Sequence, residues 1–356
     1  MESIKCPEKK QRIFYFDVIR AIACLAVVMV HVSGTLLESA PDSIDFWVGD
    51  IFNSISRVCI PFFVMISGAL FLDEDYCYGN KKMRDHILKM ILFFVFWSAV
   101  YCIVFDVVVP LASHEEIRIG TVIVNLIRGH FHLWFVYMII GLYLTVPLLR
   151  LWVKKSNSTY IRYFILILSV LVFLLPQLID TGSIFFDEIA EIRSSVDYLK
   201  NISCFPVYFV LGWYLSNFEI KHKKILTLCG AAGIVIMIGM TYFLSVRAGE
   251  GIEYYSEYYL TTLAYSAMGF VLVKDRSKAG KNDDSLFART VITISKYSLG
   301  VYASHVAVLS VVFFVMRKLS LTNALIWIPL CFITSLFISL IISAVFRKLP
   351  FLKHVV

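Results

Sequence analysis

The sequence predicts an all-α protein, a polytopic membrane bundle of about ten transmembrane helices with both termini in the cytoplasm. Three observations predict this class. Hydrophobic residues make up 59% of the 356 residues and charged residues only 17%, the mean hydropathy is +0.78, and apolar runs of about twenty residues recur along the chain. Because no polar stretch is long enough to fold alone, residues 1–356 are expected to form a single membrane-embedded domain.

Ten apolar runs are long enough to cross the hydrocarbon core, although the sixth and eighth are short. The predicted spans are 13–37, 46–72, 87–111, 133–153, 160–179, 202–218, 225–246, 258–273, 291–316 and 324–346. Lys and Arg gather in alternate connections, which predicts that these connections and both ends are cytoplasmic. The stretch 117–129 predicts an amphipathic helix at the outer interface.

Several other classes of protein are not expected. The net charge is +7, but the basic residues form short clusters between apolar runs and line no single helix face, so no nucleic-acid partner is predicted. The eight cysteines show no CxxC or Cys/His spacing, so no metal site is predicted either. The first apolar run lacks a small-residue cleavage site and contains Arg20 and His31, which favours an uncleaved first helix.

The first predicted span contains three ionisable residues, Asp17, Arg20 and His31. Each such side chain costs roughly 3 kcal/mol or more at the centre of a membrane helix, so it should face a protein interior. Arg20 and His31 are eleven residues apart, which places them on one helix face about 16 Å apart along the axis. Asp17, one turn below, could pair with Arg20. His31 is then either a hydrogen-bonded core histidine or a functional group.

Two more histidines fall at the same predicted depth, in the outer half of their spans: His132 and His305. Three histidines that converge from different helices predict a polar cavity. The second span adds Arg57 near mid-membrane, followed by Pro61, which frees a helix carbonyl. Ser67 and Gly68 near its cytoplasmic end permit either close helix packing or the approach of a ligand.

Five segments in order across nearly the whole chain resemble the acyltransferase 3 family of multipass membrane O-acyltransferases: FDVIRAIACLAVVMVH, SRVCIPFFVMISGALF, FHLWFVYMIIGLYLTVPLL, YFVLGWYL and YSLGVYASH. The family's Arg-x10-His pair falls on Arg20 and His31, and its proline-aromatic Ser-Gly segment falls on 61–68. Some members carry paired arginines after the second helix. The nearest match here is Lys81 and Arg84, a departure from that pattern.

The resemblance implies that an acyl group, acetyl being the simplest choice, passes from cytoplasmic acyl-coenzyme A to a hydroxyl near the outer face. Acetyl-CoA is then a co-substrate, and no permanently bound cofactor is expected. The implied acceptor is an envelope polysaccharide or a lipid-linked glycan, with a peptidoglycan sugar or a small metabolite as alternatives. The implied location, among membrane lipids, is the cytoplasmic (inner) membrane of a bacterial cell.

The candidate residues fit this chemistry. The phosphates of coenzyme A could be neutralised by Lys81, Lys82, Arg84 and the deeper Arg20, with Ser67 and Gly68 beside the donor. His31 could act as general base on the acceptor hydroxyl. The oxyanion could be stabilised by Arg57, His132 or His305. An acyl-His31 intermediate is an alternative.

Two other classes of function are compatible with the same residues. A transporter also uses inward-facing charges and proline-broken helices, although the halves of this chain show no internal symmetry. A sensor or assembly partner for envelope synthesis would tolerate the replacement of both Arg20 and His31 by alanine.

Overall fold

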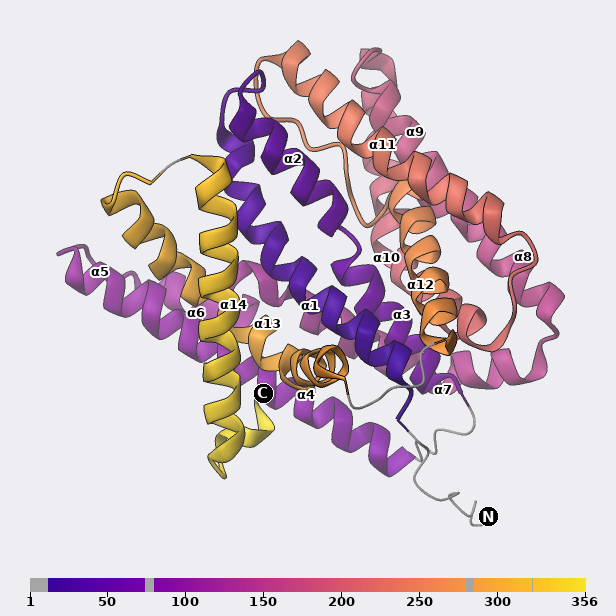
Figure 1. Cartoon of the computed structure of the whole chain (residues 1–356), viewed down its shortest axis with the longest axis horizontal. Helices are drawn as coiled ribbons and strands as arrows, with labels where there is room; N and C mark the ends of the chain where they lie inside the picture. Colours follow the sequence, from indigo (N-terminus) through magenta and orange to yellow (C-terminus); the bar gives the residue numbers. More distant parts are fainter. Residues whose placement is uncertain (1–11, 74–79, 280–284, 322) are drawn as a thin grey trace.

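The computed structural model describes residues 12–73, 80–279, 285–321 and 323–356, and within these ranges it describes all side chains except those of 80–82, 187, 190, 193–203 and 278–279. Every regular element in these ranges is a helix, so the all-α prediction is confirmed. Figure 1 shows long helices packed against one another, with α1 passing through the middle of the bundle and α5 and α6 at one edge.

The elements follow one another along the chain with short connections. They are α1 (Phe14–Gly34), η1 (Thr35–Glu38), α2 (Ile44–Ser56), α3 (Cys59–Phe71), α4 (Asn80–Cys102), η2 (Ile103–Val108), α5 (Val109–Ala112), α6 (Ile119–Arg128), η3 (Phe131–Leu133), α7 (Trp134–Lys155), α8 (Ser158–Leu168), η4 (Ser169–Leu174), α9 (Leu175–Gly182), α10 (Asp187–Asn217), α11 (Lys223–Ala248), α12 (Leu260–Ala279), α13 (Leu286–Lys318), α14 (Ala324–Lys348) and η5 (Leu352–His354). Of these, η2 and η4 are π-helical turns.

The helices are long and apolar enough to make this a polytopic membrane protein. Among the described residues, eight helical segments have the length and hydropathy of a membrane span. They are Phe14–Glu38, Ile44–Phe71, Met83–Ala112, Ile119–Lys155, Ser158–Gly182, Lys223–Ala248, Leu286–Lys318 and Ala324–Lys348. The predicted spans 202–218 and 258–273 are not among the eight, although both fall on helices, α10 and α12. The count of ten and the side of the termini therefore stay predictions.

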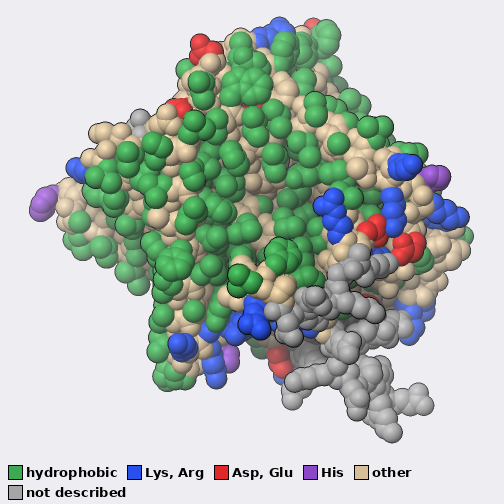
Figure 2. Space-filling view, in the orientation of Figure 1, with side chains coloured by type: hydrophobic (Ala, Val, Ile, Leu, Met, Phe, Trp, Pro, Cys, Tyr) green, Lys and Arg blue, Asp and Glu red, His purple; other side chains and the backbone are tan. Residues whose placement is uncertain are grey.

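The surface agrees with a lipid environment. Figure 2 shows hydrophobic side chains over the broad centre of one face, with charged side chains gathered toward its edges. The large apolar residues Leu148, Leu228 and Val235 are 72%, 71% and 70% exposed. A water-soluble monomer rarely exposes so much contiguous apolar surface, whereas lipid tails cover it without cost.

The second predicted span is broken, as Pro61 suggested. Helix α2 ends at Ser56 and α3 begins at Cys59, so Arg57 and Val58 form a turn between them. Proline has no N–H to donate to the carbonyl of Arg57 four residues earlier, which opens the hydrogen-bond ladder there. The amphipathic segment predicted at 117–129 is confirmed as helix α6. Most of its residues are exposed, and its contacts are with α4 and η2.

Helices α3 and α10 cross with their backbones in direct contact. A Cβ atom on Gly68 would lie 1.8 Å from the carbonyl oxygen of Phe209, and one on Gly212 would lie 2.0 Å from that of Met65. The two glycines therefore oppose each other across the crossing. Small residues of this kind allow the close approach that holds membrane helices together. This crossing fixes α3, and with it the broken turn at Arg57.

We expect Gly68→Ala to destabilise the protein by about 1–3 kcal/mol, because the added methyl group forces the two backbones apart. The matched control is Gly239→Ala in α11, where a Cβ atom would meet nothing within 4 Å. The control should be neutral or slightly stabilising, since alanine has the higher helix propensity. Unfolding of both variants in mixed detergent micelles measures the difference, and equal stability of the two would contradict the crossing.

Candidate functional site

Three imidazoles from three different helices meet in the interior, as the sequence predicted. The ring of His305 on α13 lies 5.1 Å from the ring of His31 on α1 and 5.5 Å from the ring of His132 in η3. His305 is fully buried, His132 is 3% exposed, and His31 is partly buried. Phe131 covers His31 with its ring 5.5 Å away. The ring of His31 therefore faces the protein.

A fourth imidazole extends this cluster. Nδ1 of His130 lies 3.1 Å from Nδ1 of His132, so one nitrogen donates and the other accepts. The ring of His130 stacks on Tyr101 at 4.5 Å. The hydroxyl of Tyr101 donates to the carbonyl of Ala303, and the hydroxyl of Tyr302 donates to the carbonyl of His132. These bonds tie α4, η3 and α13 together around the rings.

The hydrogen bonds of His305 fix its tautomer. Nδ1 faces the carbonyl oxygens of Tyr302 and Val301 at 2.7 and 3.1 Å. Because carbonyl oxygens only accept, Nδ1 carries the hydrogen, and the neutral ring has its lone pair on Nε2. That Nε2 and the Nε2 of His132 are buried without a partner among the described residues. Unpartnered buried nitrogens are costly in an apolar interior, which marks this spot as one built for a bound group.

Arg57 is linked to α1 through a buried asparagine. Its Nε donates to Oδ1 of Asn53 over 2.9 Å. The side-chain amide of Asn53 donates in turn to the carbonyl of Val30 and to the hydroxyl of Ser33, at 3.0 and 3.2 Å. Asn53, which is 1% exposed, thus connects the guanidinium to the turn of α1 that carries His31.

The connection between α11 and α12 enters the bundle to reach the same arginine. Glu253 pairs with Arg57 over 3.3 Å, and the guanidinium lies 4.1 Å above the ring of Tyr255. Burial raises the pKa of Tyr255, so its phenol stays neutral beneath the cation. The arginine side chain is 19% exposed, and Glu253 offsets its charge from the side opposite Asn53.

Arg20 sits at the other end of α1 within a second polar cluster. Its guanidinium lies 3.9 Å from Asp17 and 3.4 Å from the hydroxyl of Ser295. Asp17 also accepts from Arg12 at 2.9 Å and from Ser295 at 2.7 Å. The bonds with Asp17 raise the pKa of Arg12. Arg12 is therefore a closer partner of Asp17 than Arg20 is, and Arg20 keeps its guanidinium turned toward a cavity.

That inner cavity has a volume of about 240 Å³ and runs between α1, α3, α4, α7 and α13. Its polar lining consists of Arg20, Ser67, His86, Tyr143 and Ser298, and Tyr302 lines it as well. Tyr302 lies on α13 one turn before His305. The cavity therefore extends from the guanidinium toward the histidine cluster, where Tyr302 separates it from His132 and His305.

The two neighbours Ser67 and Gly68 have different surroundings. The hydroxyl of Ser67 donates to the carbonyl of Phe63 and lies 3.3 Å from that of Tyr143 within the cavity. Gly68 packs against α10. Arg84 is exposed beside Asp85, 3.7 Å away. The side chains of Lys81 and Lys82 lie outside the described residues.

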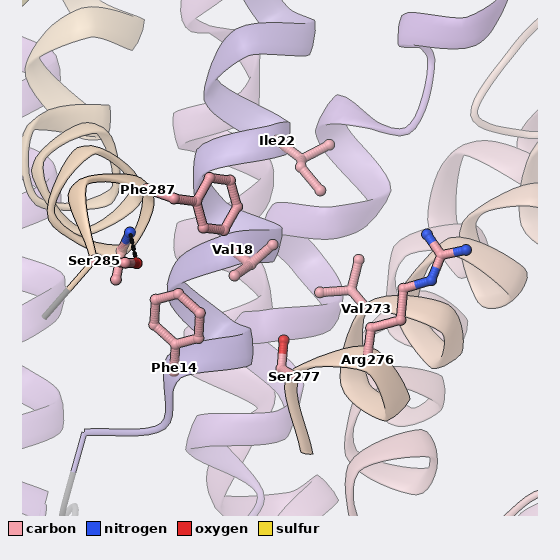
Figure 3. A pocket seen from close by; sticks show the side chains of 9 residues that line it. Phe14, Val18, Ile22, Val273, Arg276, Ser277, Ser285 and Phe287 are labelled. Carbon is pink, nitrogen blue, oxygen red and sulfur yellow. Dashed lines mark hydrogen bonds between the residues drawn. The ribbon is translucent and has the colours of Figure 1, made fainter. Parts of the chain in front are cut away.

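Another cavity lies between α1, α12 and α13 and does not include the candidate residues. Its volume is about 500 Å³, and Phe14, Val18, Ile22 and Phe287 are among its lining residues. Figure 3 shows the guanidinium of Arg276 directed away from the other labelled side chains. Oγ of Ser285 accepts a hydrogen bond from the backbone N–H of Ala288 at the start of α13. Its apolar lining and its distance from the histidines separate this cavity from the site.

Several site residues were missed from the sequence. His130 was identifiable from its spacing, since it stands two residues before His132, and Asn53 from its place one helical turn before Arg57. His86 precedes a predicted span and resembles an ordinary residue of the membrane boundary. Glu253 lies in a polar connection, and no local pattern shows that this connection reaches Arg57.

A family model described as "Acyltransferase domain" matches residues 13–344. No curated protein and no solved structure matches the chain significantly.

We expect Asn53→Ala to destabilise the protein by about 1–3 kcal/mol, because the change removes buried hydrogen bonds to α1 and to Arg57 together. Asn217→Ala is the control, since the Asn217 amide bonds only to the carbonyl of Trp213 within its own helix and is exposed. Unfolding in mixed micelles compares the two variants. A loss no greater for Asn53 than for Asn217 would show that the link to α1 is unimportant.

Proposed function

Since this chain belongs to the acyltransferase family whose domain model covers residues 13–344, we propose that it transfers an acyl group, most simply acetyl, from cytoplasmic acyl-coenzyme A to a hydroxyl of an envelope glycan near the outer face. The observation that carries the proposal is the meeting of His31, His132 and His305 beside Tyr302, which lines the cavity that also contains Arg20. A thioester and an alcohol can meet there away from bulk water.

The inner cavity suits the donor. The narrow pantetheine arm of coenzyme A needs a slot with a few polar groups along an apolar wall, and the cavity has this character. Arg20 at its mouth offers a fixed charge to a phosphate, and the exposed Arg84 offers a second one farther out. Ser67, His86 and Tyr143 then supply hydrogen bonds to the amide groups of the arm.

The histidine cluster suits the transfer step. His31 takes the proton of the acceptor hydroxyl while the oxygen of that hydroxyl attacks the thioester carbonyl. The tetrahedral intermediate collapses with cleavage of the carbon–sulfur bond, and the departing thiolate of coenzyme A receives the proton from His31. A covalent acyl-His31 intermediate would divide the same transfer into two steps.

Arg57 is the better candidate for the oxyanion. With its hydrogen on Nδ1 and bonded to backbone carbonyls, neutral His305 can only accept at Nε2, so it cannot donate to an anionic oxygen. It can instead accept a hydrogen bond or proton from the His31 side. Arg57 is a permanent donor, and Asn53 and Glu253 hold it in place.

We expect His31→Gln to lower kcat for acetyl transfer by about 10²–10⁴-fold, because glutamine cannot exchange the proton. The assay is release of coenzyme A from acetyl-CoA by the purified protein in nanodiscs, combined with the O-acetyl content of envelope glycans in cells. His222→Gln, an exposed histidine before α11, is the matched control and should keep full turnover. The transporter alternative would be favoured by two results together. The unaltered protein would show no acetyl-CoA turnover, and solute flux would persist in His31→Gln.

We expect Ser67→Phe to raise KM for acetyl-CoA at least about tenfold, because the phenyl ring fills part of the cavity proposed for the donor. Ser310→Phe is matched to it. Ser310 is also partly buried, and its hydroxyl also bonds to the carbonyl four residues earlier, but it does not line the cavity. An unchanged KM in Ser67→Phe, with normal folding, would mean that the donor binds elsewhere.

A further inference from the structure

A further cavity lies on the side of the histidine cluster opposite the cavity that contains Arg20. It has a volume of about 320 Å³ and opens between α4, η2 and α6. Tyr101, Phe105, Asp106, Asn125, Arg128 and His130 are among its lining residues. Tyr101 stands fifteen residues beyond His86 on α4, which is roughly 22 Å farther along the helix axis. The cavity therefore lies at the opposite end of the site from the one proposed for the donor.

The lining combines flat rings with hydrogen-bonding groups. The ring of Phe105 is partly exposed, and it packs on the buried ring of Tyr101 at 5.8 Å and 9° and on the ring of His130 at 5.2 Å, which hold it in place. Beside them, Oδ1 of Asp106 accepts from the amide of Asn125 at 3.0 Å. Aromatic faces pack on the C–H faces of sugar rings, and carboxylate and amide groups bind their hydroxyls. This is the chemistry of a saccharide site.

A buried hydroxyl in the same cavity has no partner. Ser98 is 1% exposed, lines the cavity, and its Oγ lacks a hydrogen-bond partner in the described part of the chain. An occupant that donates or accepts a hydrogen bond would satisfy it. The π turn of η2 is a further sign, because such turns often occur at functional sites. Here the π turn contains Phe105 and Asp106.

The cavity continues outward and also touches the site. An adjoining hollow of about 540 Å³ shares Phe105 and Asp106 and adds Glu115, Glu116 and Arg118. The combined groove is longer than one sugar ring. At its inner end, Phe131 lines the cavity and lies 5.5 Å from the ring of His31. Phe131 therefore contacts both the groove and the imidazole.

We propose that this groove binds the acceptor as a saccharide chain, with one sugar against the partly exposed Phe105 and its reacting hydroxyl directed past Phe131 toward His31. The proposal rests on the function proposed above and adds the place where the acceptor binds and the residues that bind it. Asp106, Asn125 and Ser98 hold the sugar hydroxyls, and the outer hollow holds the next sugars of the chain.

The test measures transfer from radiolabelled acetyl-CoA to soluble saccharide probes, namely maltopentaose, chitopentaose and a pentamer of mannuronate, by the full-length protein in nanodiscs. On whichever probe is acetylated, Asp106→Asn and Ser98→Ala should each raise KM for the saccharide at least fivefold and leave KM for acetyl-CoA unchanged. Glu188→Gln, a carboxylate exposed elsewhere, is the control and should alter neither. Elution as a monodisperse species establishes that each variant is folded.

The outcomes separate the two proposals. If a saccharide is acetylated and both pocket variants keep the unaltered saccharide KM, the groove is not the acceptor site, while the acyltransferase function stands. If acetyl-CoA is consumed but no saccharide probe is acetylated, the saccharide class is overturned. If the unaltered protein neither consumes acetyl-CoA nor labels any probe, the proposed function itself fails and the groove proposal fails with it.

Discussion

The interior of a membrane protein offers no water, so every polar side chain between the helices must find its partner within the protein. This constraint shapes the centre of the chain. Asn53 is bonded on one side to α1 and on the other to Arg57, and Nδ1 of His305 is bonded to its own helix. Next to these satisfied groups, the Nε2 atoms of His132 and His305 are buried without a partner among the described residues. Other unpartnered atoms, such as Oγ of Ser98, lie elsewhere in the bundle, so it is the proximity of the two imidazoles that distinguishes this place.

Backbone packing provides the rigidity that such a centre needs. The opposed glycines Gly68 and Gly212 bring α3 against α10 with no side chains between them. The turn that carries Arg57 begins α3, so its position follows from this crossing. Tyr101 and Tyr302 hold the remaining helices by hydroxyl bonds to backbone carbonyls. Close helix packing and buried hydrogen bonds thus fix the same few residues from different directions.

Much of the fold could be predicted because each apolar run carries its own signal, a length set by the thickness of the bilayer. The shared depth of His31, His132 and His305 could be predicted for the same reason, since depth follows from counting along a helix. Contacts between helices could not. The ion pair of Asp17 with Arg20, which follows from helix spacing, is present at 3.9 Å, but the sequence did not show that Arg12 and Ser295 also bind Asp17, at 2.9 and 2.7 Å.

The roles of other site residues could not be predicted from their position along a helix either, because they depend on contacts between helices. Gly68 beside Ser67 permitted two interpretations, and only the approach of α10 shows that this glycine serves packing. Glu253 reaches Arg57 because the connection that carries it folds back into the bundle, and tertiary packing alone decides that path. Helices α10 and α12 illustrate a similar limit, because a short apolar run can equally be a span or a segment buried among other helices.

The cavity proposed for the donor reaches Tyr302, and the cavity proposed for the acceptor reaches Phe131. The fully buried His305 lies between these two cavities. This partition has a consequence for the cell. A continuous water-filled passage through the bundle would let ions leak across the bilayer and dissipate their gradients. In the transfer proposed above, only the acyl group has to pass between the two cavities, so the aromatic and imidazole rings that separate them can keep hydrated ions from following it.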